Sequence, residues 1–245
     1  MENEQVKQTE IVVVLDRSGS MDSIAKATVE GFNTFLNEQK NAEGEAFITL
    51  VQFDDRYEVN YKSLPIQEAQ ELIHGETYAP RGSTALFDSI GRTINELETN
   101  KDVIFVIITD GHENASREFK KDAIKNMIET LEKENSWKFL FLAANQDAIT
   151  TGGSIGIKGS NSMSWDASER GVGNTFVSMS ANIGSYRSSK SKSSYDSYVA
   201  ENIDKNISYT EYLADVSLQS LSFSDKQRDK SMNKKEDKKE NKKEN

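Results

Sequence analysis

The sequence predicts an α/β fold: a three-layer, doubly wound sandwich around a mainly parallel sheet with one antiparallel edge strand, followed by a flexible C-terminal tail. Over about the first 165 residues, short apolar runs alternate with segments of helical spacing. One connection, within residues 46–61, is too short for a crossover and favours an antiparallel hairpin. Beyond residue 188 the chain becomes rich in Ser, Lys and Tyr without a period, which is typical of a segment that lacks a core.

The first half of the chain is expected to form a strand, a helix and the hairpin. The run "IVVVL" at 11–15 is apolar throughout, as in a strand buried on both faces. Between residues 23 and 40, apolar side chains recur three and four positions apart, which predicts a helix with one buried face. The runs "AFITLVQF" and "YEVNYKSL" form the hairpin. Residues 65–75, "PIQEAQELIHG", are expected to make a short helix closed by Gly75.

The second half repeats the alternation. Helical spacing predicts helices over 85–98 and 117–134, and apolar runs predict strands at 102–109 and 137–144. Three weaker elements complete the set of about six strands with their helices: a short helix in 146–157, an edge strand at 161–165 and a helix over 167–186. We therefore expect one domain in residues 1–187 and a low-complexity tail in 188–245, within which 207–223 is a candidate for a short ordered segment.

Composition excludes several classes of function. The 40 acidic and 30 basic residues give a net charge of −10, which argues against general binding of nucleic acids or anionic membranes. The chain has no cysteine, so disulfides, thiolate metal sites and thiol nucleophiles are excluded. The N-terminus is acidic and polar, unlike a signal peptide, and no apolar stretch approaches the roughly 18 residues of a membrane span. A cytoplasmic location is expected.

Three polar loops are expected at the edge of the sheet that is formed by the carboxyl ends of the parallel strands. They are "DRSGS" after the first strand, "RGSTALFDS" before the helix at 85, and "TDGHENAS" after the strand at 102–109. Because the carboxyl ends of parallel strands meet at one edge, Asp16, Ser18, Ser20, Thr84 and Asp110 are expected to lie together. Such an all-oxygen set suits Mg²⁺ or Mn²⁺ better than zinc or copper.

The same residues resemble the metal-ion-dependent adhesion site of the von Willebrand factor type A (vWA) domain family. The three parts are "DRSGSM", "GSTALFDSI" and "ITDGHENAS", in the family's order and separations. The similarity covers roughly residues 8–187, and "FLAANQDA" and "SIGI" resemble a bacterial and phage subset. The family fold is Rossmann-like, in agreement with the pattern above.

The resemblance implies a role for each site residue. Ser18 and Ser20 would be direct ligands, Asp16 an anchor that acts through water, Thr84 a ligand that binds directly or through water, and Asp110 the second carboxylate. It further implies a non-catalytic, metal-dependent protein-binding module that uses Mg²⁺, with Mn²⁺ or Ca²⁺ as alternatives. A protein partner with an exposed Asp or Glu would complete the coordination.

Simpler interpretations exist for each loop taken alone. Asp16 could cap the helix that starts near Asp22, and Thr84 could be the N-cap of a helix beginning at Ala85. Asp110 and Gly111 could form an ordinary loop after a strand. Asn114 and Ser116 are expected to cap a helix that begins near residue 117.

Two further groups near these loops receive simple interpretations. His112 is read as an exposed loop residue and not as an acid/base catalyst. Residues 54–56, "DDR", are read as turn residues of the hairpin.

An enzyme is the alternative from a different class. A haloacid-dehalogenase-like phosphotransferase would also place an aspartate, here Asp16, after an apolar first strand, and "VIFVIITDG" resembles its second strand with a threonine. That chemistry needs a second acid two residues after the nucleophile. Ser18 stands there, so the sequence favours the binding module.

Overall fold

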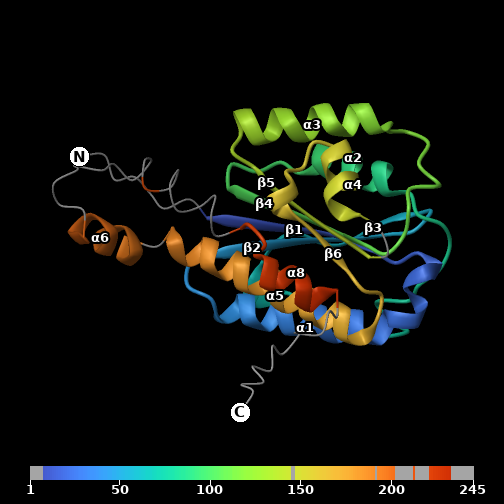
Figure 1. The fold of residues 1–245 in the computed structure, drawn as a ribbon, viewed down its shortest axis with the longest axis horizontal. Coiled ribbons are helices and arrows are strands. Elements are labelled where there is room, and N and C mark those ends of the chain that lie inside the picture. Colours follow the sequence, from blue (N-terminus) through green and yellow to red (C-terminus); the bar gives the residue numbers. More distant parts are fainter. Residues whose placement is uncertain (1–7, 145–146, 191, 202–211, 213–220, 233–245) are drawn as a thin grey trace, which may run out of the picture.

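The predicted sheet and its layers are present in the structure. The computed structural model describes residues 8–144, 147–190, 192–201, 212 and 221–232. Six strands form one sheet in the order β3-β2-β1-β4-β5-β6, and helices cover both faces (Figure 1). All neighbouring strands are parallel except β2 and β3, which are antiparallel at one edge. The fold class predicted from the sequence is confirmed.

Burial of the strands explains the apolar runs in the sequence. The central strands β1 and β4 are buried on both faces, so the residues between their ends are apolar, 11–15 in β1 and 103–108 in β4. The edge strand β3 is only partly buried and carries polar side chains. The strands are β1 (Thr9–Asp16), β2 (Ala46–Phe53), β3 (Tyr57–Pro65), β4 (Asp102–Thr109), β5 (Lys138–Ala144) and β6 (Ser162–Trp165).

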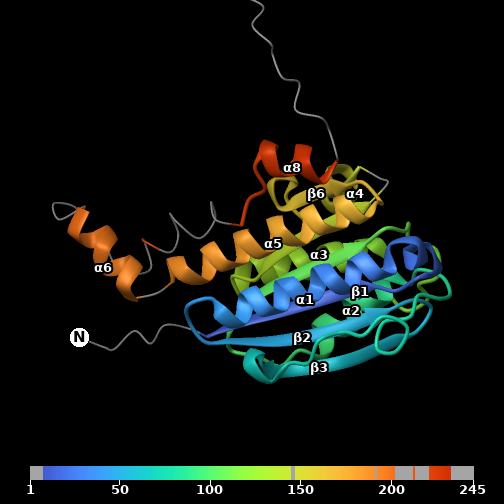
Figure 2. The ribbon, with the colours of Figure 1, turned by 90° about the horizontal axis from the view of Figure 1, so that it is seen from below.

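Two hydrophobic cores lie on opposite faces of the sheet. Alternate residues of β1 divide between them: Val13 packs with the helices α1 and α5, whereas Val12 packs with α2, α3 and α4. Figure 2 shows α1 and α5 side by side on their face. The helices are α1 (Ala25–Asn41), α2 (Leu86–Glu96), α3 (Lys121–Glu134), α4 (Ala148–Ser154), α5 (Glu169–Ser189), α6 (Lys192–Glu201) and α8 (Asp225–Ser231), with short 3₁₀ helices η1 (Gly19–Ile24), η2 (Ile66–Glu68) and η3 (Gly159–Asn161). No helix in the described part of the chain is long and apolar enough to cross a membrane.

The helix predicted for residues 65–75 is wrong. Only the single turn η2 forms, and the chain then runs on without helical structure to a turn at Gly75, whose φ is +78°. Side chains of α1 supply the hydrogen bonds that a helix would have made. Asn33 Nδ2 donates to the carbonyl of Leu72, Asn33 Oδ1 accepts from the Leu72 N–H, and Lys40 Nζ donates to the carbonyl of Ala69. Tertiary contacts therefore replace the local helix.

Part of the C-terminal region packs on the domain. Leu221 and Phe223 are buried in the core beside α5, and α8 lies against α5 and β6. The Arg228 guanidinium donates to the carbonyls of Gly159 and Ser162, next to β6. Leu221 and Phe223 belong to the candidate segment 207–223, whereas α8 is an ordered element that the sequence did not indicate. Most of the candidate segment 207–223 lies outside the described residues, and the division at residue 188 stays a prediction.

Candidate metal centre

The two predicted site carboxylates emerge next to each other because their strands are neighbours. Asp16 is the last residue of β1, and Asp110 directly follows β4. The parallel register pairs Leu15 with Ile108, so both chains leave the sheet at the same edge. Asp16 is fully buried and Asp110 is 9% exposed. The fold thus places two acids at the carboxyl edge of the sheet, as the sequence predicted.

Both oxygens of the Asp16 carboxylate accept hydrogen bonds. Oδ1 accepts from the Ser18 N–H at 2.6 Å, and Oδ2 accepts from the Thr109 hydroxyl at 2.6 Å. Burial raises the pKa of Asp16 to about 6, although the bonds from Thr109 and Ser18 lower it; nearby Asp110 raises it again. Its backbone carbonyl accepts from the buried Tyr78 hydroxyl at 2.7 Å. Thr109 is a residue of the site that the sequence did not assign.

The two serines of the first loop face each other and Asp110. Ser18 Oγ and Ser20 Oγ are 3.1 Å apart, and Ser20 Oγ donates to Asp110 Oδ1 at 2.6 Å. Since its single proton goes to Asp110, the lone pairs of the Ser20 hydroxyl are available to a cation. Burial raises the pKa of Asp110, and the Ser20 bond opposes that rise. Ser18, and not Asp16, is the N-cap of η1, and its hydroxyl makes no cap bond to that helix. The interpretation of Asp16 as a helix cap is therefore wrong.

Thr84 approaches from the loop before α2. A Cβ atom added at Gly111 would lie 2.8 Å from Thr84 Oγ1 and 3.5 Å from Ser20 Oγ, so both hydroxyls converge on this glycine. The N-cap of α2 is Ala85, and Thr84 therefore does not cap the helix. The main chain of Thr84 is fixed instead by Asn114, whose Oδ1 accepts from the Thr84 N–H at 2.9 Å.

These oxygens fit a hard divalent cation. Ligands bound at right angles at 2.0–2.1 Å lie about 2.9 Å apart, close to the 3.1 Å between the hydroxyls of Ser18 and Ser20. In the part of the chain that the structure describes, neither Asp16 nor Asp110 forms an ion pair, so no basic side chain there neutralises either carboxylate. The described residues also include no group of three or more His, Cys, Asp or Glu that could bind a metal. A metal site in this region would therefore depend on the hydroxyls.

The loop after β4 caps α2 and not α3, which corrects the prediction for Asn114 and Ser116. Helix α3 begins at Lys121, later than the expected residue 117. Ser116 Oγ accepts from the Asp88 N–H at 3.0 Å in the first turn of α2. In return the Asp88 carboxylate accepts from the N–H groups of residues 117–119, which keeps them out of a helix. These bonds lower the pKa of Asp88 against the effect of burial. His112 is exposed, as expected of a loop histidine.

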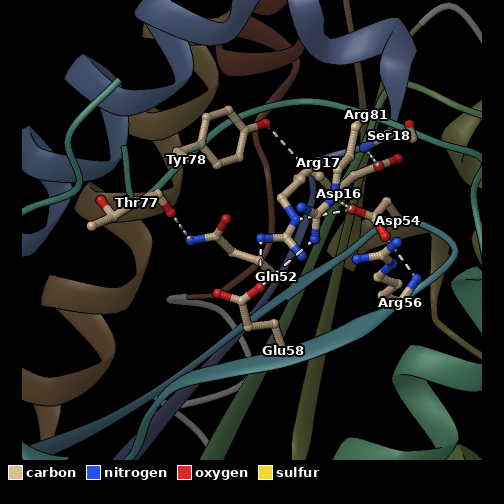
Figure 3. Close-up of polar contacts among 10 residues, drawn as sticks. All are labelled: Asp16, Arg17, Ser18, Gln52, Asp54, Arg56, Glu58, Thr77, Tyr78 and Arg81. Carbon is tan, nitrogen blue, oxygen red and sulfur yellow. Dashed lines mark hydrogen bonds and ion pairs between the residues drawn. The ribbon is translucent and has the colours of Figure 1, made fainter. Parts of the chain in front are cut away.

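Asp54 is more than the turn residue that the sequence suggested. It follows β2 directly and is fully buried. Its Oδ2 accepts from Arg17 Nε at 3.1 Å and from Arg81 Nε at 2.9 Å (Figure 3). One signal could have revealed it: β2 is parallel to β1, so an acid directly after β2 emerges beside Arg17 at the edge that carries the site.

Comparison with known proteins identifies the fold. The sequence matches no protein-family model and no curated protein. Among solved structures, proximal thread matrix protein 1 from the mussel byssus matches with a TM-score of 0.53 at 13% identity, over 70% of this chain and 44% of that chain. The ArnB paralog VWA2 from Sulfolobus acidocaldarius matches with a TM-score of 0.51 at 15% identity, also over 70% and 44%. The fold is that of a von Willebrand factor type A domain.

The matches to vWA structures extend over less than half of each solved chain. One further structure of the mussel protein is described as having a zinc-occupied MIDAS motif, the metal-ion-dependent adhesion site. It matches with a TM-score of 0.50 at 14% identity, over 66% of this chain and 42% of that chain. At these identities the likeness establishes the vWA fold alone.

Proposed function

We propose that this chain is a non-catalytic, metal-dependent protein-binding module. Ser18, Ser20 and Thr84 would hold one divalent cation, and Asp16 and Asp110 would hold its waters. Mg²⁺ is the expected cation, with Mn²⁺ or Ca²⁺ as alternatives, and an Asp or Glu of a protein partner would complete the coordination. The observation that carries the proposal is the convergence of hydroxyls from two loops, none used as a helix cap, beside two carboxylates.

The chemistry of this donor set favours an acidic partner. Hydroxyl ligands are neutral, and Asp16 and Asp110 would act at a distance, so much of the cation's charge would remain unneutralised. Mg²⁺ keeps several waters in most protein sites, and one of them can be exchanged for a partner oxygen. A carboxylate of the partner would therefore be attracted and bound reversibly.

The zinc-occupied MIDAS of the mussel protein supports divalent-cation binding on this fold in general. The preference for magnesium rests on the hard oxygen donors. A cytoplasmic location and a bacterial or phage source stay predictions from the sequence.

The phosphotransferase alternative gains no support from the described residues. It would require an acid where Ser18 stands, and the N–H of that serine is bound to Asp16. Incubation with an aryl phosphate and Mg²⁺ tests it. We expect no turnover, and turnover that is lost in Asp16→Asn would overturn the non-catalytic assignment.

Affinity purification of a tagged chain from a lysate tests the partner. In Mg²⁺ the wild type should retain proteins that excess chelator releases. Thr84→Ser keeps the hydroxyl and should retain the same proteins. Thr84→Ala should retain at least about tenfold less, because loss of even a group that only orients metal ligands costs about 10- to 100-fold in metal affinity. A set of bound proteins that survives chelation unchanged, or that Thr84→Ala retains fully, would contradict the proposal.

A further inference from the structure

Asp54 links the two loops that carry the proposed metal ligands. Arg17, which its Oδ2 binds, lies between Asp16 and Ser18 in the first loop. Arg81, bound to the same oxygen, lies three residues before Thr84 in the second loop. The other carboxylate oxygen, Oδ1, accepts from the Arg56 N–H at 2.7 Å and so closes the turn after β2. One buried carboxylate thus holds an arginine from each loop (Figure 3).

Backbone hydrogen bonds reinforce the same junction. The Arg81 N–H donates to the Arg17 carbonyl at 2.8 Å, and the Gly19 N–H donates to the Gly82 carbonyl at 3.1 Å. The Ala85 N–H, next to Thr84, donates to the Asp54 carbonyl at 2.9 Å. Residue 54 therefore touches the second loop through both its side chain and its main chain, and the relative position of the two loops depends on it.

The second loop fits closely against the turn after β2. Gly82 has a φ of +68°, a conformation that favours glycine. A Cβ atom at this position would lie 2.1 Å from Asp55 Oδ1. The loop that carries Thr84 therefore packs against the turn after β2.

Charge gives Asp54 a second effect on the site. The Arg17 side chain is only 5% exposed, and its guanidinium is balanced by Asp54 and, at 2.8 Å from Nη1, by Glu58. Arg17 directly follows Asp16, so an unbalanced guanidinium here would oppose the arrival of a divalent cation. The ion pairs with Asp54, which follows β2, and with Glu58 of β3 hold the Arg17 guanidinium beside these two strands.

We propose that Asp54 is a positioning residue of the metal centre. It sets the spacing between the serine loop and the Thr84 loop through Arg17 and Arg81, and it compensates the charge of Arg17. The inference rests on the proposed function, since it concerns the affinity of the same site for its cation.

Calorimetric titration with Mg²⁺ tests this role, with thermal melting in chelator as the measure of folding. Asp54→Asn should weaken Mg²⁺ binding about 10- to 100-fold, the range seen when groups that orient metal ligands are removed. Arg81→Gln should weaken it about tenfold, and the arginine is 46% exposed, so the fold tolerates its loss. Glu10→Gln is the control, because Glu10 is also a fully buried acid in the same sheet but binds Thr49 and Ser63 instead. It should lower the melting temperature and leave Mg²⁺ affinity unchanged.

The outcomes separate this inference from the proposed function. Folded Asp54→Asn and Arg81→Gln variants that bind Mg²⁺ like the wild type would overturn the role of Asp54 alone. If Asp54→Asn does not fold, the affinity of Arg81→Gln decides. Absence of Mg²⁺ binding by the wild type would overturn the proposed function and this inference with it.

Discussion

Strand β1 carries a buried carboxylate near each end, and the two are balanced differently. Glu10, fully buried, accepts hydrogen bonds from Thr49 at 2.8 Å and Ser63 at 2.6 Å, and it pairs with Lys101 Nζ at 3.5 Å. Asp16, equally buried, has hydroxyl and N–H partners but no ion pair among the described residues.

The two ends of β1 have different roles: Glu10 contributes to the folded structure, and Asp16 belongs to the proposed cation site. A buried carboxylate that is paired with a basic side chain of the same chain is already neutralised. Two neighbouring carboxylates without such a partner destabilise the folded state unless a cation binds to them. Lys101 neutralises Glu10 from within the chain. At the other end we propose that the neutralising charge comes from outside, as a divalent ion.

Removal of Lys101 should have the largest effect, and it acts at the Glu10 end alone. Lys101→Met leaves Glu10 buried and unpaired, which is expected to lower the free energy of unfolding by about 3–5 kcal/mol. Denaturant titration in chelator measures the change. The double variant Glu10→Gln/Lys101→Met removes both charges and should recover most of the loss, while Mg²⁺ affinity should stay at the wild-type value. A loss below about 1 kcal/mol in the single variant would show that Lys101 does not balance Glu10.

Mg²⁺ should stabilise the protein through the Asp16 end. At a free concentration 100 times the Kd, binding to the folded state adds about 2.7 kcal/mol to the free energy of unfolding. For a domain of this size the melting temperature should rise by about 5–10 °C. Melting curves in Mg²⁺ and in chelator measure the shift, which Asp16→Ala should reduce to about half or less at the same Mg²⁺ concentration and Glu10→Gln should retain. A wild-type melting temperature that does not change with Mg²⁺ would contradict the claim that the Asp16 end of β1 binds a cation.

His112→Ala should have the smallest effect. This side chain is exposed beside Asp110, and an exposed residue outside the ligand set should change the Kd for Mg²⁺ by no more than about twofold. Gly111→Ala is the matched neighbour, because its added Cβ would lie 2.8 Å from Thr84 Oγ1 and should weaken binding clearly. If His112→Ala proved as damaging as Gly111→Ala, the histidine would have to be counted among the site residues.

The sequence was sufficient to predict the sheet and the meeting of the site loops. Residues 11–15 and 103–108 are apolar because their strands are buried on both faces, and parallel neighbours place Asp16 and Asp110 at one edge. The spacing of Asp16, Ser18 and Ser20 then brings the two serine hydroxyls together at 3.1 Å. The apolar runs predict the parallel strands, and the parallel strands bring the loops that follow them to one edge. The meeting of the site loops can therefore be predicted from the sequence.

Other features depend on contacts that sequence spacing does not reveal. The position of Asp54 after β2 indicates the edge at which it emerges, but its ion pairs with the arginines at 17 and 81 depend on two distant loops. Residues 65–75 have helical spacing, yet Asn33 of α1 binds both backbone groups of Leu72. Ser116 caps α2 from 28 positions further along the chain. Each depends on side chains far away in the sequence, which a local pattern cannot place.

Calorimetric titration of the wild type and of Asp16→Ala with Mg²⁺ is the most direct test of the central claim, that the Asp16 end of β1 is built for a cation. The account predicts that the wild type binds one Mg²⁺ and that Asp16→Ala binds it about 10- to 100-fold more weakly, because the carboxylate that fixes the serine loop is lost. Equal affinities in the two proteins, or no binding by the wild type, would contradict the claim and leave "DRSGS" as an ordinary turn.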